Sequence, residues 1–306
     1  MTAKCIQNKK DKAVSHFKPI ICIILFIYAI CFSNSLKEGV IYGFKICVMN
    51  IIPTLFPFFI LADMWRVVIY FSPNPKLCKL LNIDLQFLDA FLIGNICGFP
   101  LGAKMLTEKY REGIIEKEDL DSLIPLCTNP SLAFVISGIG AGLLGSIKSG
   151  FILYFSTIIS SAFIYLLLPH KTHFSKNSSI KSEQTFSLVD SIRNAGTSCA
   201  TVSSFIIFFS AIIGLVKSLI KNKLILSLIS AFLEIGSACS TIAECDGLSY
   251  VFSLMLIAFS LAFSGISVFL QVLSVAPSDL SKRRYISRKL LQGILSAGIT
   301  FLILQI

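Results

Sequence analysis

Charged side chains are scarce in this 306-residue chain. Asp, Glu, Lys and Arg together make up 14% of it, whereas soluble proteins carry about a quarter. Hydrophobic residues make up 55%. So few charges exclude an ordinary soluble enzyme and a disordered protein, because both need many polar groups facing water. The balance is typical of a helical protein that crosses a membrane several times.

Acidic residues are the scarcer of the two signs, with 17 Asp and Glu against 27 Lys and Arg, which leaves a net charge of +10. Lys and Arg collect in the cytoplasmic loops of membrane proteins, and this alone explains the excess. A protein that binds nucleic acid would need a soluble basic face, so we expect no nucleic-acid partner. An anionic substrate or anionic membrane lipid could add to the bias.

The motifs of common catalytic and metal centres are missing. The chain has no Gly-x-Ser-x-Gly, no His-Glu-x-x-His and no Walker loop. His170 and His173 form a pair in a polar loop, but two ligands are too few for a metal site. The 10 cysteines include no Cys-x-x-Cys pair, and most lie in apolar runs as small hydrophobic residues. We expect no enzyme, no metal and no cofactor.

Uncharged runs long enough to approach the roughly 20 residues that a helix needs to cross a bilayer recur along the chain. They are residues 19–36, 46–62, 122–147, 149–169, 194–216, 247–278 and 290–306. Segments 90–104 and 224–243 are apolar but short or interrupted, and we expect them to re-enter the membrane rather than cross it. Residues 104–121 carry charges of both signs and predict a helix on the membrane surface.

The order of these segments predicts two halves. Residues 1–18 form a basic tail that we place in the cytoplasm, followed by a retained first helix, because the apolar run is too long for a signal peptide. The first membrane half is 19–169, a polar cytoplasmic loop is 170–186, and the second half is 187–306.

The basic residues suggest how these segments cross the membrane. We expect 19–36 to go out and 40–62 to return, 123–145 to go out and 150–168 to return, 199–216 to go out, 250–273 to return and 290–306 to go out. Almost every basic cluster then lies inside, including Lys289. The cluster at Lys217, Lys221 and Lys223 lies outside and counts against this topology.

The two halves then run in opposite senses, 40–62 against 199–216 and 123–145 against 250–273. The string Ser-Leu-Ala-Phe occurs at residue 131 and again at residue 260. Such a pattern is typical of transporters with inverted repeats. The fold class we expect is an all-α polytopic membrane protein, an inverted-repeat bundle with broken or re-entrant helices.

Four interruptions within apolar segments predict polar groups at membrane depth. Near Pro53 and Pro57 the candidates are Asn50 and Thr54, although a kink facing lipid would explain the prolines equally well. In the third break Thr128 or Asn129 would cap a helix that Pro130 opens, with Ser131 beside it. The fourth has Ser264, Ser267 and Gln271, where small residues could instead serve close helix packing.

The second interruption runs from Asn95 to Lys104. Gly98 permits an unusual backbone, and Pro100 suits the first turn of a new helix. The positive end of that helix and Lys104 one turn further would both attract an anion. Alternatively, Lys104 only extends toward the cytoplasmic surface.

Glu234 lies between two apolar runs. A carboxylate there is costly, so it should be protonated, paired or beside a cavity. Its functional roles would be coupling to protons or cations, or a hydrogen bond to a substrate. Its structural role would be to pair with Lys104 or a hydroxyl group.

Several of these strings resemble one family. The string from Gly94 to Lys104, Gly-Asn-Ile-Cys-Gly-Phe-Pro-Leu-Gly-Ala-Lys, resembles the Gly-Tyr-Pro-x-Gly-Ala-Lys signature of the sporulation integral membrane protein YlbJ (SpoVV) family, with Phe99 in place of the usual Tyr. Segments 53–60, 127–131, 232–236 and 264–272 look like further motifs of that family in the same order. The resemblance covers about residues 40–275.

The resemblance implies membership of the nucleoside-recognition (Gate) group, with a fold related to concentrative nucleoside transporters. It also implies transport of a small anion such as dipicolinic acid, in the outer forespore membrane or cell membrane of a spore-forming bacterium. The alternatives are a nucleoside transporter of the same fold and a non-transporting membrane protein needed for spore assembly. The sequence also leaves a homo-oligomer as a possible assembly.

Overall fold

The computed structural model describes residues 19, 23, 24, 26–68, 85–167 and 187–305. Within these residues every regular element is helical, and five helices are long and apolar enough to cross a membrane. These are Ser33–Leu61, Ile147–Leu167, Leu188–Leu219, Tyr250–Val275 and Lys282–Gln305. The chain is therefore a helical, multi-pass membrane protein, as its composition predicts. The expected basic tail 1–18 and the whole of the expected loop 170–186 lie outside the described residues.

The first of these spans joins α2 (Ser33–Ile46), the π-helix η1 (Cys47–Ile51) and α3 (Ile52–Val68). The chain bends just before it, at Phe32, where φ is −110° and ψ is 35°. The predicted start at residue 40 is therefore wrong. Charges at Lys37 and Glu38 suggested a loop, but both side chains lie on the exposed face of α2.

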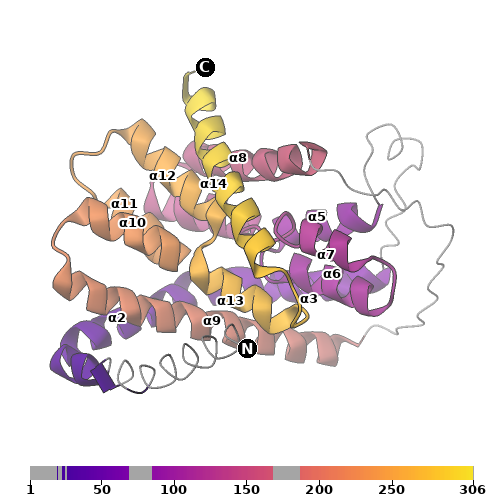
Figure 1. Ribbon diagram of the computed structural model, residues 1–306, viewed down its shortest axis with the longest axis horizontal. Coiled ribbons are helices and arrows are strands. Elements are labelled where there is room, and N and C mark those ends of the chain that lie inside the picture. Colours follow the sequence, from indigo (N-terminus) through magenta and orange to yellow (C-terminus); the bar gives the residue numbers. More distant parts are fainter. Residues whose placement is uncertain (1–18, 20–22, 25, 69–84, 168–186, 306) are drawn as a thin grey trace, which may run out of the picture.

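Helix α2 packs antiparallel against α9 (Leu188–Leu219), a pairing visible along the lower edge of Figure 1. The Tyr28 hydroxyl near one end donates to the Leu215 carbonyl at 3.0 Å, whereas the Cys47 thiol lies 3.8 Å from the Ser203 carbonyl. The contact is close because Gly39 has no side chain: a Cβ there would lie 2.4 Å from the Ser210 carbonyl oxygen. Helix α9 begins 11 residues earlier than the predicted residue 199.

Two pairs of short helices form hairpins. Hairpin 1 consists of α5 (Leu85–Ile96) and α6 (Leu101–Arg111), and the Lys109 ammonium binds the Asp89 carboxylate at 2.6 Å across its open end. Hairpin 2 consists of α10 (Lys223–Leu233) and α11 (Ile235–Ala243), and the Lys223 ammonium binds Asp246 and, at 3.1 Å, the Glu244 carbonyl. Each hairpin thus returns to the end where it started, which is the geometry expected of a re-entrant segment.

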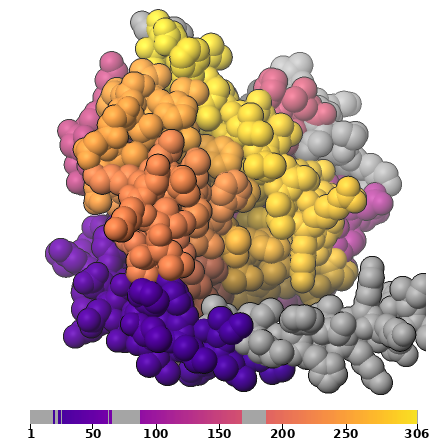
Figure 2. Space-filling model, turned by 60° about the vertical axis from the view of Figure 1, so that its left-hand side comes forward, coloured from indigo at the N-terminus to yellow at the C-terminus, as the bar shows by residue number. Residues whose placement is uncertain are grey.

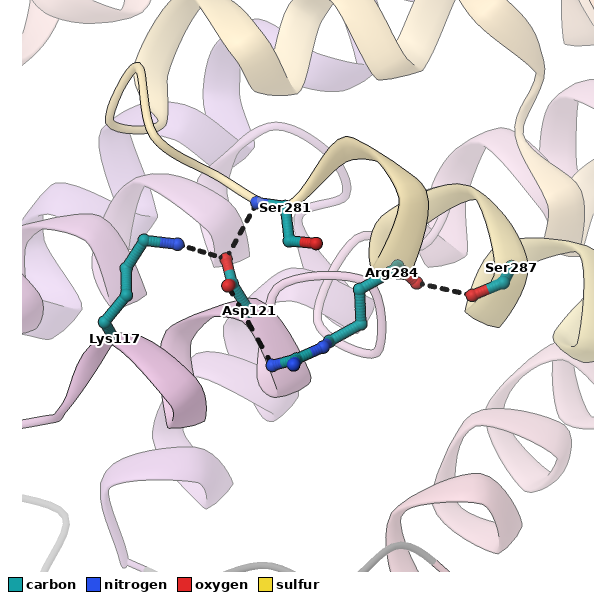
Figure 3. Close-up of polar contacts among 5 residues, drawn as sticks. All are labelled: Lys117, Asp121, Ser281, Arg284 and Ser287. Atoms are coloured by element: carbon teal, nitrogen blue, oxygen red, sulfur yellow. Dashed lines mark hydrogen bonds and ion pairs between the residues drawn. The ribbon is translucent and has the colours of Figure 1, made fainter.

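The polar segment 104–121 is not one helix, contrary to our expectation. It holds the end of α6 and the start of α7 (Lys117–Leu123), separated by a turn in which Gly113 has φ +73°. Figure 3 shows how α7 is anchored: the Asp121 carboxylate accepts from Lys117 at 2.6 Å and from the Ser281 amide at 3.0 Å, with the Arg284 guanidinium 3.9 Å away. These contacts fix α7 to the start of α14 (Lys282–Gln305).

Two apolar segments, called the broken spans below, contain irregular backbone: residues 124–143 and the span Tyr250–Val275. Residues 124–131 are mostly irregular, and the regular helix η2 (Phe134–Leu143) follows them as a π-helix. In the second half α12 (Tyr250–Phe263) and α13 (Gly265–Val275) are separated at Ser264, where φ is +71°. The predicted helices 123–145 and 250–273 are therefore each interrupted where Pro130 and Gly265 stand.

The open ends of the two hairpins lie at opposite ends of the broken spans. Helix α12 starts seven residues after α11 ends, and the chain leaving α13 soon reaches Ser281, which binds α7 just beyond hairpin 1. In the other broken span, the chain leaving η2 enters α8 (Ile147–Leu167), where the Ser149 hydroxyl binds the Tyr250 hydroxyl at the start of α12. The two broken spans thus run in opposite directions. Figure 2 shows hairpin 2 on one face of the molecule, where it packs against α12.

Candidate functional site

The tips of the two hairpins and the two breaks surround one buried cavity, called the central cavity below. Both hairpin tips and both broken spans contribute polar side chains, glycines or Phe99 to its lining. These residues are Gly98, Phe99, Ser131, Glu234, Gly236, Ser267 and Gln271. Apolar side chains of η1, α3 and α9 close it, including Ile51, Leu55, Val202 and Ile206. The space open to water inside it is about 30 Å³, which holds about two water molecules.

Each hairpin tip packs against one break, and a glycine with positive φ permits the approach in both places. At Gly98, with φ +86°, a Cβ would lie 2.8 Å from the Ser131 amide nitrogen. At Gly265, with φ +69°, a Cβ would lie 3.1 Å from the Leu233 carbonyl oxygen. The Phe99 amide also donates to the Asn129 carbonyl at 3.0 Å. The backbone of the hairpin tips is therefore held by the irregular backbone of the broken spans.

Glu234 forms the tip of hairpin 2. Its backbone is extended, with φ −154° and ψ 131°, which ends α10, and its carboxylate then caps α11. One carboxylate oxygen accepts from the Gly236 amide at 2.7 Å and the other from the Ser237 amide at 2.6 Å. The side chain is 4% exposed and lines the central cavity. Its partners are thus the positive end of a helix, and neither Lys104 nor a hydroxyl group is its main partner.

Ser131 caps the helix that follows the 128–131 break, since its hydroxyl accepts from the Phe134 amide at 3.2 Å. The predicted caps were Thr128 and Asn129, and that prediction is wrong. The Thr128 hydroxyl donates to the Ile124 carbonyl at 2.6 Å, and the Asn129 side chain donates to Leu126 at 2.9 Å, so both satisfy the irregular backbone before the break.

Ser267 and Gln271 lie one turn apart on α13 and face the central cavity. The Gln271 amide nitrogen lies 3.5 Å from the Ser267 hydroxyl, at the limit of a hydrogen bond. Its side-chain oxygen is buried and has no hydrogen-bond partner within the part of the chain that the structure describes. An unsatisfied buried acceptor costs about 1–3 kcal/mol, so this oxygen is suited to a bound donor.

The structure brings five of the predicted site residues to the central cavity: Gly98, Ser131, Glu234, Ser267 and Gln271. Two others support the cavity from behind. The Asn95 side-chain oxygen accepts from Asn129 at 3.1 Å, which braces hairpin 1, and the Ser264 hydroxyl donates to the Leu261 carbonyl at 3.0 Å, which closes the end of α12.

Three predicted residues lie apart from the cavity. Asn50 is exposed on η1, and the Thr54 hydroxyl donates to the Asn50 carbonyl at 2.6 Å, which suits a kink rather than a site. Lys104 is half-buried on α6 and does not line the cavity. It stands a full turn beyond Pro100, on the part of α6 that leads back to the open end of hairpin 1.

Lys289 is the residue that sequence reasoning misplaced. We assigned it to a cytoplasmic cluster, yet it is 1% exposed inside α14, beside the fully buried Gln292. The available signal was spacing: Lys289, Gln292, Ser296 and Thr300 fall on one face of a helix, and all four are buried.

No family model, no curated protein and no solved structure matches the chain. The fold and the site define the class of protein: a helical, multi-pass membrane protein with a small cavity, mostly apolar but holding one carboxylate and one amide side chain, at the junction of four helix breaks. Among the described residues no group of three His, Cys, Asp or Glu side chains is placed to hold a metal ion.

Proposed function

We propose that this chain is a carrier that moves a small polar solute across the membrane through the central cavity. One observation carries the proposal: the tips of two hairpins and the breaks of two spans all border one buried cavity that holds a carboxylate and an unsatisfied amide oxygen. Irregular backbone and polar groups at membrane depth are tolerated where they form a substrate site.

The directions of the elements support an inverted repeat. Helices α2 to α3 run against α9, the two broken spans run against each other, and the two hairpins open at opposite ends. Two oppositely oriented halves around a midplane site are the usual plan of secondary carriers. This arrangement agrees with the resemblance to proteins related to concentrative nucleoside transporters.

The chemistry of the cavity bears on the substrate. The family resemblance favours a small anion such as dipicolinate, handled during sporulation in the outer forespore membrane or cell membrane. The charged side chain that lines the cavity is Glu234, and Lys104 lies outside it. A carboxylate, an amide and two hydroxyl groups suit a neutral hydrogen-bonding solute, so a nucleoside is the second candidate.

The size of the cavity indicates a closed conformation. Sites for small organic molecules usually measure about 300–1,000 Å³, whereas the space inside this one is about 30 Å³. A carrier must therefore open the cavity before either solute can enter. Hairpin 2 is suited to this movement, because its connections to α9 and to α12 are short and both lie at its open end.

The experiment is uptake into proteoliposomes that contain the purified full-length protein. Radiolabelled dipicolinate and uridine are supplied separately, and the Glu234→Gln variant is compared with the wild type and with Glu244→Gln, a control at an exposed position. We expect uptake of one of the two solutes, lowered about tenfold or more by Glu234→Gln and unchanged by the control. If neither solute binds to the protein or enters the proteoliposomes, whichever way the protein is inserted, the result would support the non-transporting alternative.

A further inference from the structure

The ammonium group of Lys289 lies in a cage of neutral oxygens. It donates to the Thr128 carbonyl at 2.8 Å and to the Gln292 side-chain oxygen at 2.8 Å, and the Asn129 side-chain oxygen lies 3.4 Å away. Gln292 is itself held in place, because its amide donates to Asn129 at 2.8 Å and to the Thr157 carbonyl at 3.2 Å. None of the ion pairs among the described residues involves Lys289.

This surrounding is unusual for a buried lysine. Burying an ammonium group without a carboxylate is costly, so its oxygen partners must replace the lost hydration. Backbone carbonyls of an unwound helix segment together with side-chain amide oxygens are the ligands that membrane carriers use for small monovalent cations. Divalent cations prefer carboxylate ligands, and this cage has none. The oxygens of Thr128, Asn129 and Gln292 therefore have the chemistry of a monovalent-cation site.

The cage also lies next to the backbone that supports the tip of hairpin 1. Asn129 belongs to the 128–131 break, its carbonyl accepts from Phe99, and its side chain donates to Asn95. The hydrogen bonds of the Lys289 side chain thus hold the backbone against which the tip of hairpin 1 rests.

We propose that Thr128, Asn129 and Gln292 form a monovalent-cation site whose occupant is the Lys289 ammonium, so that the protein needs no free Na⁺ or K⁺ at this break. The proposal concerns the cage alone and stands whether or not the central cavity carries a solute. It predicts that removing the lysine side chain converts the cage into a site for a free ion.

The test compares the thermal unfolding of full-length wild-type protein and three variants in detergent, followed with a thiol-reactive dye. Each sample is measured at equal ionic strength in LiCl, NaCl, KCl, ammonium chloride and choline chloride. Lys289→Ala keeps the oxygens of the cage and removes the side chain that fills it, so that a free ion can enter. Lys289→Met fills the path with an apolar chain, and Lys282→Ala removes an exposed lysine from the same helix.

We expect Lys289→Ala to unfold at a lower temperature than the wild type in choline chloride. At least one small cation should raise its Tm by about 3 °C at ten times the Kd of that ion. Wild type, Lys289→Met and Lys282→Ala should not distinguish the small cations from choline.

Two results would overturn the proposal: the same cation response in the wild type, or a Lys289→Ala variant that responds to none of the ions. If that variant is aggregated on size-exclusion chromatography in every salt, the proposal is also wrong, because a free cation should restore the cage in at least one of them.

Discussion

At the scale of single residues, the polar groups of the central cavity divide into those whose hydrogen bonds are complete and those left open. Glu234 and Ser131 each cap a helix, so their partners are supplied by the fold. Gln271 differs, because its oxygen is buried without a partner among the described residues. A group that the fold leaves unsatisfied is the better candidate for a contact with substrate.

Gln271→Leu tests this distinction. Replacing the amide by an apolar group of similar size removes an unsatisfied acceptor, so the free energy of unfolding should stay the same or rise by about 1 kcal/mol. Transport should nevertheless fall, because the substrate loses a hydrogen bond. Thermal unfolding and proteoliposome uptake measure the two effects on the same preparation.

The matched control is Gln292→Leu, since Gln292 makes hydrogen bonds to Asn129, Thr157 and Lys289. That variant should be destabilised by about 2 kcal/mol or more, because it leaves those partners buried and unpaired. Equal destabilisation by both substitutions would mean that Gln271 is structural.

How well single residues could be predicted depended on how local their role is. Gly98 and Glu234 stand out in sequence because a glycine and an acid interrupt apolar runs, and both lie at hairpin tips. Lys104 and Lys289 look alike in sequence, since each lies in a basic, polar stretch. The spacing of Lys289 with Gln292, Ser296 and Thr300 marks a polar face of α14, but the 128–131 break that covers this face lies 160 residues away, and no local pattern identifies it.

At the scale of helical elements, the backbone at the tip of hairpin 1 is constrained in two ways. Gly98 has φ +86° and its missing Cβ leaves space for Ser131, whereas Gly247 has φ +90° with nothing within 4 Å of a Cβ. The two glycines therefore separate conformational strain from steric contact.

Gly247→Ala should cost about 1 kcal/mol through the positive φ alone. Gly98→Ala carries the same strain and also forces the tip of hairpin 1 away from the 128–131 break, so we expect at least twice that loss and a large fall in transport. Chemical or thermal unfolding measures the first effect, and uptake measures the second. If both variants lose the same stability, hairpin 1 does not rest on the break as described.

The ion pairs at the open ends of the hairpins should differ in strength. The side chains of Lys109 and Asp89 are 13% and 27% exposed, against 56% and 91% for Lys223 and Asp246. Asp89→Asn should therefore destabilise the protein by about 1 kcal/mol, and Asp246→Asn should have a clearly smaller effect. The comparison is made by thermal unfolding at low and high salt, and the reverse order would contradict it.

The exposed pair also predicts a pH dependence. The hydrogen bond and charge of Lys223 lower the pKa of Asp246 from its ordinary value of 3.8. A lowered carboxyl pKa stabilises the fold above the ordinary value and loses this effect as the pH falls through the lowered pKa. The pair should thus be intact above a pH of about 4 and be lost in more acidic solution. The difference in Tm between wild type and Asp246→Asn should therefore vanish in that acidic range.

Helix boundaries were harder to predict than helix breaks. Gly98, Pro130 and Glu234 each interrupt a helix where the sequence suggested, because glycine, proline and a capping carboxylate act on their own backbone. The starts of α2 and α9 were placed too late, since charged residues at 37–38 and 190–193 were taken to mark loops. In the structure these side chains lie on exposed helix faces, so their charge does not end the helix.

At the scale of the whole molecule, two hairpins approach one cavity from opposite directions. The multi-pass helical class followed from composition, because only helices satisfy their own backbone in lipid. The antiparallel pairing of α2 with α9 and the junction of four breaks depend on contacts between residues far apart in the chain, and could be inferred only through the proposed repeat.

The most direct test of this central claim is the side of the membrane to which each hairpin opens. Single cysteines are introduced at Glu112, in the exposed turn after hairpin 1, and at Gly247, in the exposed turn after hairpin 2. The exposed native Cys31, the neighbouring Cys245 and the three cysteines outside the described residues, Cys5, Cys22 and Cys78, are replaced by serine. Intact and permeabilised cells are then treated with a membrane-impermeant maleimide.

In intact cells we expect labelling at one of the two positions only, and the concentration of Lys and Arg around α7 and the start of α14 places position 112 on the protected, cytoplasmic side. Both positions should be labelled after permeabilisation. Labelling of both in intact cells, or protection of both, would place the two hairpins on the same side and contradict the account.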